Sequence, residues 1–301
     1  MPVSKNIDEL FSPGYLRQLE ALSLAARQLV RGRMRAERKS HQRGASVEFA
    51  EYRPFAEGDD LRNVDWHAYA RWRQLVIKLY VEEEDLHVHI LLDHSMSMDW
   101  GEVNKFDYAR QLAGGLAYLA LGNMDRVGVT LTGDRSASHW PVSRGKGHLL
   151  PLLRFLTAAD VTGQALPMEK AVQRWMISKP RRGLVLVLSD FWGQDPQDAR
   201  QALNRIRYGG HEVALIQIIS PDELEAGSYG EYEIRESDYG QQMKVVVDAA
   251  MVRNYHKQLE DYQQQLQAYC KRYQIPFLQA NTREPVEELL LTSLRHGGYI
   301  R

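Results

Sequence analysis

The strongest constraint on this chain is the alternation of short apolar runs with amphipathic helical stretches that begins near residue 86. Five runs have the length and apolar content of buried strands: 85–93, 126–133, 183–190, 211–220 and 275–280. Because strands joined by helical crossovers form parallel sheets, we predict a doubly wound, mostly parallel α/β sheet with helices on both faces over residues 86–301. The stretch at about 229–248 has two alternating segments around Asp238, Tyr239 and Gly240, which predicts an inserted β-hairpin.

Residues 1–85 are more charged and less periodic than the rest of the chain. Apolar residues recur at helical spacing over 16–34, and strand-like alternation over 47–55 and 75–83 flanks a short helical stretch at 64–72. We therefore predict a smaller N-terminal α+β region before the main domain.

Composition places the chain among ordinary globular proteins. A net charge of −1 over 301 residues gives no overall attraction to nucleic acid or anionic lipid. Cys270 is the only cysteine, so no internal disulfide can form, which fits a reducing compartment. Residues 1–20 lack the apolar core of a signal peptide, and no apolar run reaches the roughly 18 residues of a membrane span. We expect a soluble, cytoplasmic protein of bacterial type.

Carboxylates and hydroxyls follow the ends of two predicted strands. In the stretch LLDHSMSMDWG, Asp93 ends an apolar run, and Ser95 and Ser97 follow at alternate positions, so the three side chains can point the same way. Asp190 ends a second run, and Thr162 lies before a helix between the two. Parallel sheets bind ligands at the carboxyl ends of their strands, and hard oxygen donors favour Mg²⁺. We predict that these side chains converge on one divalent-metal site.

The order Asp93, Ser95, Ser97, Thr162, Asp190 resembles the metal-ion-dependent adhesion site of a von Willebrand factor A (VWA) domain. The resemblance implies a VWA-like fold that holds Mg²⁺ or Mn²⁺, with Ser95, Ser97 and Thr162 as direct ligands. Asp93 and Asp190 would act directly or through water, and one coordination position would stay open for an acidic side chain of a protein partner.

One departure concerns the loop before the predicted threonine ligand. Asp160 and Val161 stand where the VWA family usually has two glycines, which let the backbone turn freely. Thr157 is therefore the alternative to Thr162.

An upstream stretch, VEFAEYRPFAEGDDLRNVDWHAYAR (47–71), resembles the signature of the bacterial family called domain of unknown function 58 (DUF58). The matching positions are Arg53, Phe55, Gly58, Asp59, Asp60, Arg62, Val64, Asp65 and Trp66. The resemblance implies a non-enzymatic binding module that acts with a MoxR-type AAA+ ATPase in assembling or maturing other proteins. The signature itself is interpreted as a turn with local ion pairs, with a functional surface as the alternative.

Two other functions compete with this one. Phosphohydrolases of the haloacid-dehalogenase type also place an aspartate after an apolar strand, but they need a second carboxylate two residues on, where this chain has Ser95. They also need a lysine against the phosphate, and the sequence offers no clear candidate. The other function is nucleic-acid binding through the basic stretch 31–43. Because this stretch is short, the simpler interpretation is a solvated helix end and loop.

Three further features have both structural and functional interpretations. His87 and His89 share one strand face and could bind a metal, although strand histidines are usually structural. Apolar residues at spacings of three and four over 251–273 could pair with a partner helix, but docking on the chain's own sheet is favoured. Cys270 is interpreted as a packing residue.

Overall fold

The computed structural model describes most of the chain, in these ranges: 6–22, 48–56, 58–81, 86–132, 138–162, 166–191, 196–224, 230–235 and 242–296. It divides into two compact units, one formed by Met1–Val30 with Leu86–Arg301 and the other by Arg31–Asp85. Among the described residues, no helix is long and apolar enough to cross a membrane.

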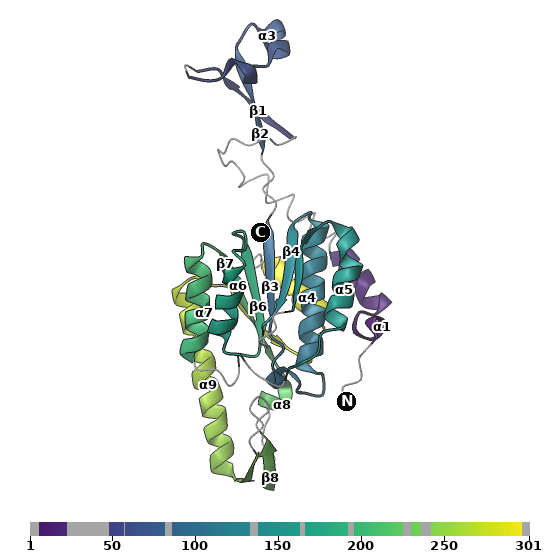
Figure 1. The fold of residues 1–301 in the computed structure, drawn as a ribbon, viewed down its shortest axis with the longest axis vertical. Helices are drawn as coiled ribbons and strands as arrows, with labels where there is room; N and C mark the ends of the chain where they lie inside the picture. The colour runs from purple at the N-terminus through teal and green to yellow at the C-terminus, as the bar shows by residue number, and fades with distance from the viewer. Residues whose placement is uncertain are drawn as a thin grey trace. The chain divides into compact units, whose positions relative to one another are not determined.

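A six-stranded sheet forms the centre of the larger unit, in the order β10-β7-β6-β3-β4-β5 (Figure 1). Its strands are β3 (His87–Leu92), β4 (Arg126–Leu131), β5 (His139–Arg144), β6 (Leu184–Ser189), β7 (Glu212–Ile219) and β10 (Phe277–Asn281). Every neighbouring pair is parallel except β4 and β5, which are antiparallel. The predicted doubly wound, mostly parallel α/β fold is therefore confirmed.

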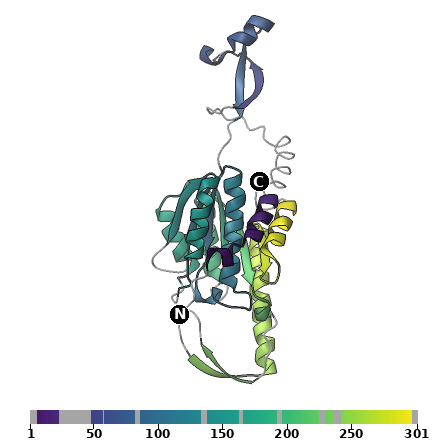
Figure 2. The ribbon, with the colours of Figure 1, turned by 90° about the vertical axis from the view of Figure 1, so that its right-hand side faces the viewer.

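Helices cover both faces of this sheet (Figures 1 and 2). The labelled helices of this unit are α1 (Ile7–Leu10), α4 (Lys105–Gly122), α5 (Leu149–Thr157), α6 (Met168–Ile177), α7 (Pro196–Tyr208), α9 (Ala249–Arg272) and α10 (Val286–His296), with the short α8 (Pro221–Leu224) directly after β7. Side chains of α4, α5 and α10 share one buried core with the sheet, and those of α6, α7 and α9 share a second. Two separate cores on opposite faces are what a doubly wound sheet requires.

The N-terminal helical residues, 7–10 and 13–22, belong to this unit. They pack where α4 carries two glycines: a Cβ atom added at Gly114 would lie 2.5 Å from Phe11 Cε1, and one at Gly115 would lie 2.7 Å from Tyr15 Oη. Tyr15 Oη also donates a hydrogen bond of 2.6 Å to the Gln111 carbonyl. This differs from the N-terminal region expected over 1–85, because the buried face of the first helices has its partner on α4.

Helix α9 carries the heptad-like apolar pattern. Its buried side chains Leu259, Leu266 and Cys270 face inward, and the last two share the second core with α7. Tyr269 Oη donates a hydrogen bond of 2.7 Å to Asn204 Oδ1 on α7. The pattern is thus used for docking within the chain. Preceding α9, β8 (Gly230–Arg235) and β9 (Gln242–Val247) pair antiparallel, where the inserted hairpin was expected.

The smaller unit contains β1 (Glu48–Pro54), β2 (Val76–Val81), a 3₁₀ turn (Leu61–Asn63) and α3 (Trp66–Trp72), with β1 and β2 antiparallel. It holds the DUF58 signature, whose acidic residues make local contacts.

Asp65 caps α3 by accepting hydrogen bonds from the His67 and Ala68 amides, and its carboxylate lies 3.0 Å from Lys78 Nζ. Asp59 forms an ion pair of 2.7 Å with Arg53. These contacts support the structural interpretation of the signature. The basic stretch 31–43 lies outside the described residues.

Candidate metal site at the strand ends

Asp93 follows directly after β3 and is almost fully buried, with 2% of its surface exposed. Its amide donates a hydrogen bond of 2.9 Å to the Leu188 carbonyl of β6. Its Oδ1 accepts from the Ser95 amide at 3.0 Å, and its Oδ2 accepts from the Ser189 hydroxyl at 2.6 Å. One backbone and two side-chain hydrogen bonds therefore fix Asp93 at the carboxyl ends of two adjacent parallel strands.

The two serines of the motif lie beside this carboxylate. Ser95 precedes a 3₁₀ turn (Met96–Met98), and its hydroxyl lies 3.0 Å from that of Ser97. In an octahedral Mg²⁺ site with metal–oxygen distances near 2.1 Å, neighbouring ligands are about 3.0 Å apart. The spacing of the two hydroxyls fits adjacent positions of such an octahedron.

Thr162 joins this group through the backbone. It forms a parallel bridge with Ser95, and its amide donates a hydrogen bond of 2.8 Å to the His94 carbonyl. Thr157, the alternative, donates its hydroxyl to the Leu153 carbonyl within α5 at 2.9 Å. The geometry therefore favours Thr162. Neither Asp160 nor Val161 has a positive φ, so the two glycines usual in the VWA family are not needed for this turn.

Asp190 follows β6 and is also buried, with 3% of its surface exposed. Its Oδ2 accepts a hydrogen bond of 2.7 Å from Lys105 Nζ, and its carbonyl accepts one of 3.1 Å from Gln217 Nε2. Phe191 turns the chain away with φ of 56°. One oxygen of Asp190 is thus engaged by an internal cation.

Lys105 is a member of this buried cluster that the sequence did not predict. It is the first residue of α4, has no exposed surface, and lies between Asp190 Oδ2 at 2.7 Å and Glu223 Oε1 at 2.5 Å. Glu223 Oε2 accepts from the Ser220 amide at 3.0 Å, which ties α8 to the same cluster. A lysine at the first position of a mostly buried helix was the only signal in the sequence, because its partners lie 85 and 118 residues further along.

Burial dominates the electrostatics of this cluster. The pKa of Asp93 is raised to about 6, mainly by burial and secondly by the negative charge of the nearby Asp190 carboxylate. Burial also raises the pKa of Glu223 above its ordinary range. Burial alone would lower the pKa of Lys105, but the Asp190 and Glu223 carboxylates outweigh it and raise this pKa overall. With three carboxylates and one ammonium, the fully ionised cluster carries a formal charge of −2.

The donor set suits a hard divalent cation. Asp93, Ser95, Ser97, Thr162 and Asp190 offer only oxygen, and a divalent ion would neutralise the charge of the cluster. Within the described ranges, no group of three or more His, Cys, Asp or Glu side chains is arranged to hold a metal. A metal here would therefore depend on the hydroxyls as well as the carboxylates.

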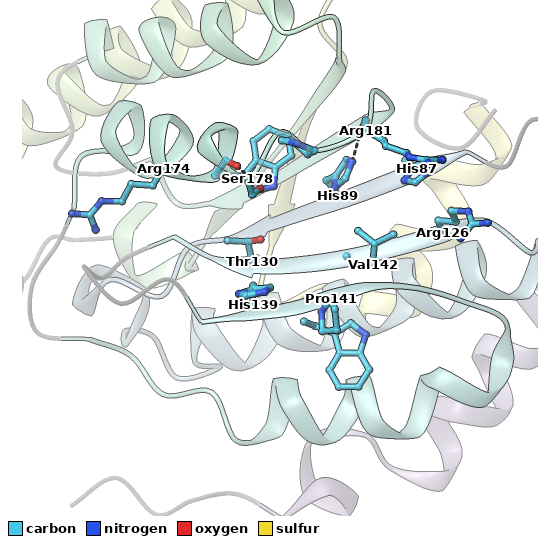
Figure 3. Close-up of a pocket in the computed structure, with 14 residues that line it drawn as sticks. His87, His89, Arg126, Thr130, His139, Pro141, Val142, Arg174, Ser178 and Arg181 are labelled. Atoms are coloured by element: carbon cyan, nitrogen blue, oxygen red, sulfur yellow. Dashed lines mark hydrogen bonds between the residues drawn. The ribbon is translucent and has the colours of Figure 1, made fainter.

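The histidine pair of β3 has a structural environment instead. His89 Nε2 donates a hydrogen bond of 2.9 Å to the Arg181 carbonyl (Figure 3), and its ring contacts Trp175 with centroids 5.2 Å apart. Burial lowers the pKa of His89 to about 4, so this ring is neutral at pH 7. The structural interpretation of His87 and His89 is favoured.

Comparison with known proteins gives the family. A model of the family described as "Protein of unknown function DUF58" matches residues 51–265. The chain belongs to the DUF58 family. It is 24% identical over 254 residues to the uncharacterized proteins Mb1516 of Mycobacterium bovis and Rv1480 of Mycobacterium tuberculosis. These matches cover 83% of this chain and 79% of each relative.

Several solved structures are also similar to this DUF58 protein. BatB from Bacteroides thetaiotaomicron aligns with a TM-score of 0.44 and 15% identity over 70% of this chain and 98% of that one. The VWA domain of SpRpn10 aligns with a TM-score of 0.42 and 11% identity over 70% and 95%. Manganese-loaded TRAP from Plasmodium vivax aligns with a TM-score of 0.33 and 15% identity over 44% and 57%.

Proposed function

We propose that this DUF58 protein is a divalent-metal-dependent protein-binding module and not an enzyme. The observation that carries the proposal is the cluster at the strand ends: the Ser95 and Ser97 hydroxyls, 3.0 Å apart, lie next to a buried carboxylate that already has its orienting donors. Mg²⁺ or Mn²⁺ held there would present a coordination position to an acidic side chain of the partner, as the VWA resemblance implies.

The protein's own residues prepare this site before any partner arrives. Ser189 and the Ser95 amide hold the Asp93 carboxylate in one orientation, so little side-chain entropy remains to be lost on binding. Lys105 holds Asp190 in the same way. A pre-organised site of this kind supports recognition of an acidic partner. The family resemblance further suggests a MoxR-type AAA+ ATPase as that partner, acting in assembly or maturation of a protein complex in the cytoplasm.

The phosphohydrolase alternative has less support. Ser95 lacks the carboxyl group that would act as general acid. Lys105 is the lysine of this cluster that could contact a phosphate. It has no exposed surface, however, and forms ion pairs with two carboxylates. A substrate phosphate would have to displace both of them.

Titration of the purified protein with Mg²⁺ and Mn²⁺ by calorimetry tests the proposal. Wild type should bind one ion saturably, and Asp93→Ala should lose this binding. Asp261→Ala, which removes an exposed carboxylate on α9, is the matched control and should bind like wild type. Equal binding by all three proteins, or retained metal-dependent partner capture by Asp93→Ala, would contradict the site assignment.

A further inference from the structure

Arg110 of α4 is a buried arginine, with 5% of its surface exposed, that bonds to the end of a neighbouring helix. Its Nη1 donates hydrogen bonds to the carbonyls of Ala159 at 2.7 Å and Thr157 at 3.1 Å. A longer bond of 3.3 Å goes to the Leu156 carbonyl. The last carbonyls of a helix have no donor within the helix, so a buried helix end needs partners from elsewhere. Arg110 is such a partner where α5 ends at Thr157.

Two further contacts fix the direction of this guanidinium. Its central carbon lies over the Phe106 ring, 4.7 Å from the ring centroid, and its Nη2 forms an ion pair with Asp107. The Asp107 amide donates a hydrogen bond of 3.0 Å to Asn104 Oδ1, and Asn104 Nδ2 donates one of 2.7 Å to Asp99 Oδ1. Arg110 is thus the inner end of a chain of polar contacts that begins at Asp99, in the loop that follows the serines of the metal motif.

The residues that Arg110 holds lead directly to the predicted threonine ligand. Only two residues separate Ala159 from Thr162 in the third loop (residues 158–162). At its other end, this loop is fixed by the bond of 2.8 Å from the Thr162 amide to the His94 carbonyl. A segment of this length spans roughly 10 Å when extended, so it has little freedom once both ends are held. Arg110 and the first loop together therefore restrain the backbone that carries Thr162.

We propose that Arg110 is a positioning residue of the candidate metal site. It holds the third loop so that the Thr162 hydroxyl can join those of Ser95 and Ser97 on one divalent cation. This inference rests on the metal-binding function proposed above. Arg110 does not bind the metal itself, because a guanidinium group has only donors. Groups that orient metal ligands affect metal affinity by about 10- to 100-fold when they are removed.

Charge and position predict opposite effects of removing Arg110. Loss of a buried positive charge makes the surroundings of the site more negative, which by itself should tighten the binding of a cation. Loss of the bonds to the third loop should instead weaken it, since Thr162 is then no longer held beside Ser95. Weaker Mg²⁺ binding by Arg110→Met would therefore identify the positional effect.

Calorimetric titration of the full chain with Mg²⁺ is the first test. Arg110→Met should weaken binding about tenfold. In a Thr162→Ala background the same substitution should change the affinity by less than about twofold, because the ligand that Arg110 positions is already absent. Arg205→Met removes an arginine that forms an ion pair with Glu169 between α7 and α6; it is the control and should bind like wild type.

Hydrogen exchange of the metal-free full chain gives a second measurement. The Thr162 amide should exchange at least about tenfold faster in Arg110→Met than in wild type. The Asp93 amide, which bonds to the Leu188 carbonyl, should exchange as in wild type. Arg110→Lys keeps a cation beside Asp107 and is the milder variant, to be used where Arg110→Met does not fold. Its one nitrogen cannot reproduce the two that arginine uses, so it should accelerate the same amide.

Unchanged or tighter Mg²⁺ binding by Arg110→Met would overturn the proposal, as would an equal loss of affinity in the wild-type and Thr162→Ala backgrounds. Thr162 and Asp93 amides that respond equally would also contradict it, because Arg110 would then act on the fold as a whole. Wild type that binds no Mg²⁺ would overturn the proposed function instead. The exchange measurement needs no metal, so it would still decide whether Arg110 holds the third loop.

Discussion

The substitution Asp93→Asn should stabilise the metal-free protein at neutral pH while abolishing metal binding. Burial and the Asp190 carboxylate raise the pKa of Asp93 from 3.8 to about 6 in the folded protein, whereas the unfolded chain keeps its ordinary value. The folded state therefore binds a proton more tightly than the unfolded state, and stability falls as the pH rises from about 4 to about 6. Converted at 1.36 kcal/mol for each pH unit, the cost above pH 6 is about 3 kcal/mol.

Asparagine removes this cost and keeps the shape of the side chain. Its carbonyl oxygen can still accept from the Ser95 amide, and the Ser189 hydroxyl can turn to accept from its amide group. We expect the free energy of unfolding of Asp93→Asn to exceed that of wild type by up to about 3 kcal/mol at pH 8, and to match it near pH 4.

Urea unfolding at pH 4 and pH 8, with a chelator present, measures the free energy of unfolding of wild type and of Asp93→Asn. Asp261→Asn, on the exposed face of α9, serves as the control and should show no such pH-dependent difference. With saturating Mg²⁺, wild type should regain stability at pH 8 and Asp93→Asn should not. A variant less stable than wild type at pH 8 without metal would refute the reasoning, since the ionised carboxylate would then be stabilising.

The remaining predictions concern the charge of the cluster, its third loop and the helix interface. Lys105→Met makes the cluster more negative and should tighten Mg²⁺ binding at least tenfold, whereas Glu223→Gln makes it less negative and should weaken it; calorimetry that finds both weakened would assign Lys105 a purely structural role. Thr162→Ala should lower Mg²⁺ affinity in the same assay while Thr157→Ala leaves it unchanged, and the reverse result would exchange the two ligands. Gly114→Val should lower the free energy of unfolding by about 1–3 kcal/mol in urea, because its side chain would collide first with the Phe11 ring; an unchanged midpoint would contradict docking of the first helices at this position.

Local patterns were enough to predict the sheet and to predict that some of the candidate site residues lie close together. Strands β3 and β6 are short apolar runs that end on a carboxylate, and parallel pairing brings such ends together without further information. Asp93, Ser95 and Ser97 are close in sequence, so their relative placement follows from the geometry of one turn. Their identification as a group needed only the rule that ligands bind at the carboxyl ends of parallel strands.

Contacts between distant parts of the chain were not predictable in this way. Lys105 and Glu223 are 118 residues apart, and nothing in either local sequence indicates that they meet at Asp190. The sequence grouped the first helices with residues up to 85 for the same reason, since their contact surface on α4 is a pair of glycines about 100 residues away. A glycine in a helix indicates that another element packs closely against it, but it does not identify that element.

The way the chain enters and leaves the smaller unit has a further consequence. Residues 31–85 interrupt a unit whose two segments, before and after them, fold together. Strand β1 begins opposite the end of β2, with Glu48 paired to Val81, so the first and last described residues of the smaller unit are neighbours in space. A segment joined to the larger unit at both ends cannot be released by a single proteolytic cut. It can be removed in the laboratory by joining the two flanking segments through a flexible linker. The remaining chain would then keep every residue of the metal cluster, which would separate what the signature contributes from what the metal contributes.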